Sequence, residues 1–112
     1  MQTGDLVFIF CSDEFLLNMN IEYLQHDYYT DIITFDYSEG GKLSGEMYIS
    51  YDRVIDNAKD LKVRELDELH RVIIHGVLHL CGYKDKTKKD EQKMRKAEES
   101  ALNLRPLPLL GL

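Results

Sequence analysis

Two histidines, His75 and His79, are the residues of this chain whose types and spacing most clearly indicate chemistry. On an α-helix, side chains four residues apart lie one turn apart on the same side, so these two imidazoles can bind one ion. Gly82 then allows the backbone to leave the helix in a left-handed conformation. This reversal can bring Asp85 back towards the histidines. We therefore predict one metal ion per chain, held by His75, His79 and Asp85.

Three protein ligands with a fourth position open are the arrangement of a catalytic zinc site, in which the metal activates a water molecule. A carboxylate such as Asp85 ligates zinc, and it makes the site more anionic and more tolerant of manganese or nickel than a third histidine would. The spacing also matches the metzincin peptidases, in which Glu follows the first histidine as the general base. Gly76 occupies that position here. The alternative for Asp85 is that it only caps the next turn.

A longer block around these residues resembles the signature of a known family. Residues 75–85 read H-G-V-L-H-L-C-G-Y-K-D, which is similar to the H-G-x-L-H-L-x-G-Y-D-H signature of the YbeY family. Three further segments agree, in the family's order, within residues 5–100. Residues 30–35 are similar to T-D-V-L-S-F, residues 45–50 to G-D-I-x-I, and residues 17–18 to L-N.

The resemblance implies a function and a fold. YbeY proteins are metal-dependent, single-strand-specific endoribonucleases, so it implies a zinc-dependent hydrolase that acts in ribosomal RNA maturation and ribosome quality control. Its partners would be ribosomal RNA and the ribosome, and its location the cytoplasm. The implied fold is zincin-like, with an antiparallel edge strand along the active-site cleft. Family members carry another strand and helix before the segment that corresponds to residues 5–11. We expect these two elements to be missing from this sequence, which is either truncated or lacks them altogether.

The chain departs from the family signature at three positions. The third histidine of the signature falls on Asp85, and the Asp before it falls on Lys84. An Arg that contributes to activity in the family falls on Leu24. The general base is therefore not identified by the sequence. His26 lies near the missing Arg and is a weak candidate for a cation or proton donor to phosphate; the alternative is an ordinary loop histidine.

Composition limits the protein class. The chain has 112 residues, of which 30% are charged and 44% hydrophobic, which is typical of one globular domain spanning residues 1–112. No apolar run approaches the roughly 20 residues of a membrane helix, and the first residues lack the basic segment of a signal peptide. The two cysteines, Cys11 and Cys81, form no disulfide framework. We expect a reduced cytoplasmic protein without a membrane or disulfide partner.

The distribution of charge is uneven. The chain has a net charge of −6, which by itself disfavours nucleic-acid binding. Residues 84–96, however, hold seven cationic and three acidic side chains, a local charge of +4 beside the predicted metal site. We interpret Lys84, Lys86, Lys88 and Lys89 as RNA-binding residues that neutralise the phosphate backbone. The alternative is a solvated helix face.

Hydrophobic periodicity predicts an α+β domain, in which a small mixed sheet packs against helices. Leu66, Leu69, Ile73 and Val77 are expected to face the core from the helix that carries the histidines. On the same helix, Cys81 is expected to be a packed apolar residue. The predicted strands are residues 6–11, 32–35 and 45–51; the predicted helices are 12–23, 52–61, 63–81 and 87–103; and residues 104–112 form an irregular tail.

Two other function classes compete with the nuclease. A peptidase or amidase is favoured by the zincin spacing and disfavoured by Gly76. A non-catalytic, metal-stabilised ribosome-binding module is favoured by the absence of Arg at position 24. Cleavage of RNA, compared with cleavage of protein, distinguishes the three classes.

Overall fold

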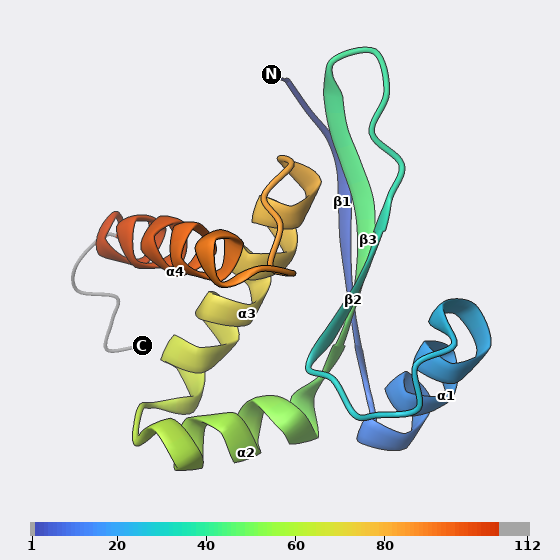
Figure 1. Cartoon of the computed structure of the whole chain (residues 1–112), viewed down its shortest axis with the longest axis vertical. Coiled ribbons are helices and arrows are strands. Elements are labelled where there is room, and N and C mark those ends of the chain that lie inside the picture. Colours follow the sequence, from blue (N-terminus) through green and yellow to red (C-terminus); the bar gives the residue numbers. More distant parts are fainter. Residues whose placement is uncertain (1, 106–112) are drawn as a thin grey trace.

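The computed structural model describes residues 2–105; residue 1 and residues 106–112 lie outside the described part. Within it, three strands form one mixed sheet in the order β1-β3-β2, with β1 parallel and β2 antiparallel to the central β3 (Figure 1). The strands are β1 (Gln2–Cys11), β2 (Ile32–Asp36) and β3 (Lys42–Ser50); the helices are α1 (Asp13–Leu24), α2 (Tyr51–Leu61), α3 (Glu65–Leu80) and α4 (Lys88–Asn103). The predicted α+β class with a small mixed sheet is confirmed.

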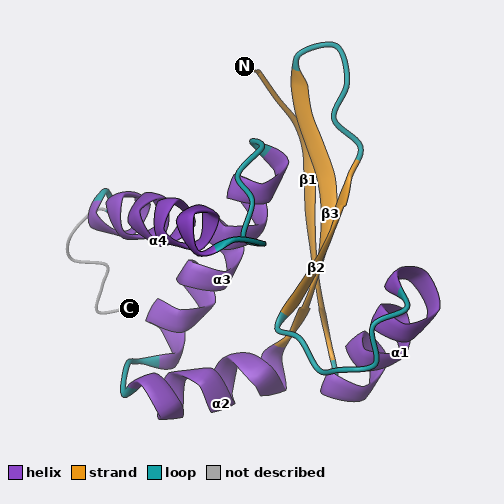
Figure 2. Ribbon diagram, viewed as in Figure 1, coloured by secondary structure: helices purple, strands orange, loops and turns teal. Residues whose placement is uncertain are grey.

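The helices cover the sheet unequally. Helix α3 packs on β2 and β3, α4 lies on the far side of α3 from the sheet, and α1 lies on the opposite side of the sheet from α3 (Figure 2). In β3, Leu43, Met47 and Ile49 are buried, whereas Glu46 and Tyr48 between them are only partly covered. This alternation is typical of a strand with one face on the core. Of the helices in residues 2–105, none is long and apolar enough to cross a membrane.

Gly76 brings α3 close to the sheet. A Cβ atom added at this buried position would lie 2.7 Å from Ile32 Cδ1 and 3.0 Å from Met47 Sδ. Position 76 therefore faces the sheet, and a glutamate there would place a carboxylate among apolar side chains. The close packing at Gly76 therefore explains why this position has no glutamate, the residue that acts as the general base in the peptidases.

Local signals set the ends of the helices. Ser12 caps α1 by accepting a hydrogen bond from the backbone N–H of Phe15, and Thr87 caps α4 in the same way through Asp90 N–H. Helix α3 ends in a Schellman motif, in which Gly82 has φ 101°. The N–H groups of Gly82 and Tyr83 donate to the carbonyls of His79 and Leu78. The predicted reversal after the second histidine is confirmed.

Three predictions of detail are wrong. Leu66 is 40% exposed. It points away from the buried side of α3, which is formed by Glu68, Val72, Gly76 and Leu80. Cys81 is exposed, because it follows the last helical residue, in the turn where the chain leaves α3. Strand β1 begins at Gln2 rather than residue 6, because pairing with β3 extends it past the apolar run. Both cysteines are free thiols. The predicted tail lies mostly outside the described residues.

Candidate metal centre

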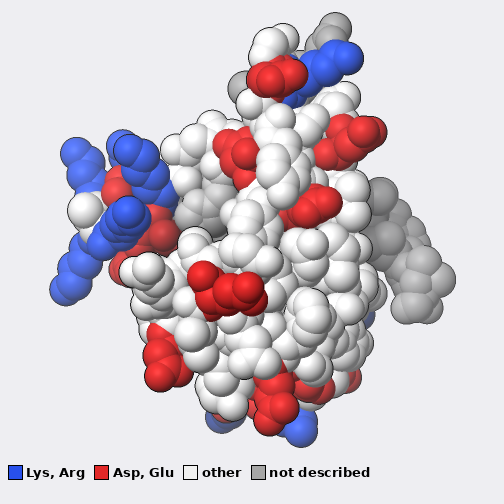
Figure 3. All heavy atoms as spheres, turned by 90° about the vertical axis from the view of Figure 1, so that its right-hand side faces the viewer, with Lys and Arg blue, Asp and Glu red and all other residues white. Residues whose placement is uncertain are grey.

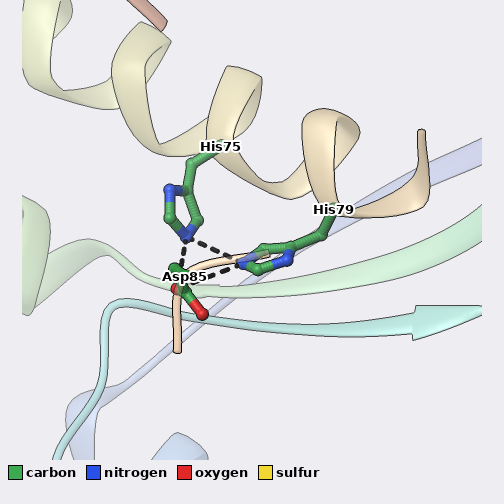
Figure 4. Close-up of side chains that lie close together, drawn as sticks. All are labelled: His75, His79 and Asp85. Carbon is green, nitrogen blue, oxygen red and sulfur yellow. Dashed lines mark hydrogen bonds and ion pairs between the residues drawn. The ribbon is translucent and has the colours of Figure 1, made fainter. Parts of the chain in front are cut away.

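The structure brings the three predicted ligands together. The Nε2 atoms of His75 and His79 lie 3.0 Å apart, and Asp85 Oδ2 lies 3.4 Å from the first and 3.3 Å from the second. Figure 4 shows both imidazoles pointing from α3 towards the carboxylate, which the chain reversal carries back beneath them. The candidate site is therefore built from one helix and the turn that directly follows it.

Two acceptors fix the orientation of the imidazoles. His75 Nδ1 donates to Glu98 Oε2 at 2.6 Å, and His79 Nδ1 donates to the backbone carbonyl of Tyr83 at 3.0 Å. A carboxylate and a carbonyl can only accept, so each Nδ1 atom carries the proton and each Nε2 atom presents a lone pair to the site. Metal-ligating histidines are held in the same way in known zinc proteins.

These donor atoms fit a zinc ion. Tetrahedral coordination at about 2.0–2.2 Å separates neighbouring ligand atoms by about 3.3–3.6 Å, close to the distances among His75, His79 and Asp85. Two nitrogen lone pairs and a carboxylate oxygen repel one another unless a cation lies between them. The mixed nitrogen and oxygen set suits zinc.

A network of buried charged side chains contacts His75 on the side away from Asp85 and His79. Arg71 donates to Glu68 at 2.7 Å, and at 3.4 Å to both Glu98 and Asp31. The side chains of Glu68 and Glu98 are only 1% and 8% exposed. Because Glu98 also accepts from His75, the network connects α3, α4 and the residue before β2 to one candidate ligand.

Burial and pairing act against each other on the pKa values of this network. Burial lowers the pKa of His75, but the hydrogen bond to Glu98 and the surrounding carboxylates outweigh it and raise the pKa. Burial raises the pKa of Glu98, but His75 and Arg71 outweigh it and lower the pKa. Glu98 is therefore the charged acceptor that the His75 tautomer requires. Burial raises the pKa of Asp31 despite the opposing charge of Arg71.

A cleft of about 540 Å³ opens at the site. Its walls include His75, His79 and Asp85 on one side and residues 30–34 on the other. Residues 32–34 belong to β2, the antiparallel edge strand. The arrangement implied by the family resemblance, an edge strand beside the cleft, is therefore present.

The other predicted site residues are dispersed. Lys86 lines the cleft and Lys84 lines a neighbouring pocket. Lys88 and Lys89 are exposed in the first turn of α4. His26 is exposed, stacks on Tyr28 and is not among the residues that line the cleft.

Leu24 and His70 lie at different distances from the candidate site. Leu24, where the family has Arg, lines the cleft. His70 contacts Arg105, so it lies outside the site.

Sequence reasoning missed the supporting charges. Glu98 lies four residues after Met94, and both are buried on the same face of α4. Glu68 similarly lies in line with Val72 and Gly76 on α3. An acid on the buried face of a helix was the available signal, since buried carboxylates are paired. The partner of each acid could not be read from this signal.

Substitution of Asp85 tests the third ligand. Asp85→Ala is expected to weaken zinc binding because it leaves two protein ligands, whereas Asp85→His, with the residue of the family signature, is expected to retain it. Competition with a chromophoric chelator measures both affinities. If Asp85→Ala binds zinc as tightly as the unmodified protein, Asp85 is only a turn residue.

Known proteins resemble this chain over most of its length. The family model described as "Endoribonuclease YbeY" matches residues 1–105. A relative of that name from Porphyromonas gingivalis is 60% identical over 99 residues, which cover 88% of this chain and 66% of the relative. Another, from Cytophaga hutchinsonii, is 59% identical over 102 residues, covering 90% of this chain and 71% of the relative. The chain thus spans slightly less than two thirds of the length of the first of these relatives.

A solved structure gives the same result for the fold. A Thermotoga maritima protein, determined in solution, superposes with a TM-score of 0.57 at 29% identity and covers 94% of this chain and 77% of its own. The histidine pair, the glycine reversal and the edge strand beside the cleft all lie within residues 1–105, which the family model matches. The chain belongs to the YbeY endoribonuclease family.

Proposed function

We propose that this protein is a zinc-dependent, single-strand-specific endoribonuclease that acts in ribosomal RNA maturation and ribosome quality control in the cytoplasm. Convergence of His75, His79 and Asp85 at the wall of a cleft is the observation that carries the proposal. Relatives named "Endoribonuclease YbeY" at 53–60% identity support the reaction class. Ribosomal RNA and the ribosome are the proposed partners.

In the proposed mechanism, His75, His79 and Asp85 hold one zinc ion. When bound, zinc polarises a phosphoryl oxygen or lowers the pKa of a water molecule, which assists hydrolysis of a phosphodiester. Glu98 and the Tyr83 carbonyl keep both Nε2 atoms unprotonated and aimed at the ion. The nucleophile is either water or the RNA's own hydroxyl group.

Cationic side chains give the RNA a path to the cleft. Lys86 lines the cleft directly after the ligand Asp85. Lys88 and Lys89 lie in the first turn of α4, where the helix dipole disfavours cations but favours phosphate groups. In Figure 3, most of the visible Lys and Arg side chains gather at the left of the molecule, with others at its top and bottom, while Asp and Glu are scattered over the visible face.

The function is tested by comparing RNA with protein as substrate. Metal-loaded protein is incubated with a structured RNA that carries a single-stranded tail and, separately, with casein. We expect cleavage within the tail, no cleavage of casein, and loss of RNA cleavage in His75→Ala. Cleavage of casein alone would establish the peptidase, and binding of RNA without cleavage would establish the non-catalytic module. The buried position of Gly76 against the sheet opposes the peptidase.

Replacing three lysines tests the RNA path. The triple substitution of Lys86, Lys88 and Lys89 by Gln should weaken RNA binding, because each lost phosphate contact removes about 0.7 from the slope of log affinity against log salt for a single strand. The slope should therefore flatten by up to about two units. All three side chains are exposed, so metal content should not change. Affinity measured across a salt series decides the matter; an unchanged slope would mean that these lysines are only a solvated face.

A further inference from the structure

A second pocket lies beside the metal centre and has no role in holding the ion. It has a volume of about 380 Å³ and is lined by Cys81, Gly82, Tyr83, Lys84, Asp90 and Lys93. This volume lies within the range of about 300–1,000 Å³ typical of ligand pockets. The pocket is open to solvent. Its walls come from the turn after α3 and from α4.

The side chains that line this pocket include an aromatic ring, two cations and a hydrogen-bond acceptor, which are the groups that bind the parts of a nucleotide. Tyr83 is 40% exposed and offers an aromatic ring, on which any base can stack. Lys84 and Lys93 offer cations for a phosphate, and Asp90 offers an acceptor for the amino group of a base. A Cβ added at Gly82 would meet no atom within 4 Å, so this wall leaves open space for a ligand.

The pocket and the metal centre are joined through a very short stretch of chain. Tyr83 lines the pocket, and its backbone carbonyl accepts the hydrogen bond from His79 Nδ1. Lys84 lines the pocket, while the next residue, Asp85, lines the metal cleft. The pocket and the metal cleft therefore have walls formed by consecutive residues of one turn.

We propose that this pocket binds one nucleotide of a single-stranded RNA next to the phosphodiester at the metal, with its base stacked on Tyr83 and its phosphate between Lys84 and Lys93. The inference deepens the proposed nuclease function and rests on it. It also supplies a physical basis for single-strand specificity, because only an unpaired base can leave its stack and lie against a tyrosine ring.

Substitutions of Tyr83 test the stack. Tyr83→Leu removes the ring, and the affinity of the metal-loaded protein for a fluorescent single-stranded RNA should fall at least about fivefold, as expected for loss of one base–aromatic stack. Tyr83→Phe keeps the ring and should bind like the unmodified protein. Metal content should be equal in all three proteins, because the hydrogen bond from His79 goes to the backbone carbonyl at position 83, which all three keep. Equal affinities for Leu and Phe variants would overturn the proposal.

A scan with abasic RNAs locates the nucleotide. Tyr83→Leu should no longer reduce RNA affinity when the RNA lacks the base at the one position next to the cleavage site. It should still reduce affinity when the RNA lacks a base at any other position. A loss that is the same for every abasic position would mean that no base stacks on Tyr83. Lys93→Gln should also weaken binding, whereas Lys96→Gln, an exposed lysine outside the pocket, serves as the matched control.

The exposed thiol of Cys81 provides an independent readout. RNA should slow alkylation of Cys81, which lines the pocket, but not of Cys11, which is partly covered in β1 and contacts the Ile49 carbonyl. Failure of the pocket is distinguishable from failure of the function: RNA cleavage without protection of Cys81 rejects the pocket alone. Binding and protection without cleavage keep the pocket and reject the nuclease, and the absence of RNA binding rejects both.

Discussion

His79→Ala is expected to abolish stoichiometric metal binding and, with it, RNA cleavage. His79 supplies one of three ligand atoms, and its Nε2 atom lies 3.0 Å from that of His75. Zinc binding in small proteins contributes about 10–16 kcal/mol, so losing about a third of it weakens affinity by at least about a hundredfold. Elemental analysis of purified protein, together with chelator competition, measures the loss.

His26→Ala is the matched control for this experiment. It also removes an imidazole, but from an exposed loop outside the cleft, so metal content should stay at one ion per chain. The same variant tests His26 as a catalytic residue, because a loss of cleavage at full metal content would assign it a role in the reaction. Equal metal content in His79→Ala and the unmodified protein would refute the proposed site.

Glu98→Gln is expected to weaken both the fold and the metal site. Glu98 is buried, accepts from His75 at 2.6 Å and contacts Arg71 at 3.4 Å. Hydrogen bonds to charged groups contribute about 1.5–3 kcal/mol, so the free energy of unfolding of the metal-free protein should fall by about that amount. Loss of the charge that fixes the His75 tautomer should lower zinc affinity by about 10- to 100-fold.

Glu99→Gln separates this effect from a general loss of negative charge. Glu99 is the next residue on α4 and is exposed, so the same chemical change there should alter neither stability nor zinc affinity. Urea denaturation of the metal-free proteins and chelator competition give the two quantities. If Glu98→Gln and Glu99→Gln have the same stability and the same zinc affinity, the Glu98 carboxylate does not position His75.

The sequence by itself determined the features that depend on local geometry. The pair His75 and His79 converges because four residues make one helical turn, and Asp85 returns because Gly82 adopts a left-handed conformation. The helix caps at Ser12 and Thr87 follow for the same reason, since each involves atoms three residues apart. Family membership followed from the order of these local motifs along the chain.

Only the tertiary structure decided what surrounds the ligands. Glu98 meets His75 across 23 residues of chain, and Asp31 meets Arg71 across 40, because α4 and the start of β2 dock on α3 at one particular position. Helical periodicity shows that a face is buried but not which side chain lies opposite each position on it. The same limit explains why Leu66 was assigned to the core and why the close approach at Gly76 was not foreseen: both depend on where a neighbouring element packs, which no local spacing encodes.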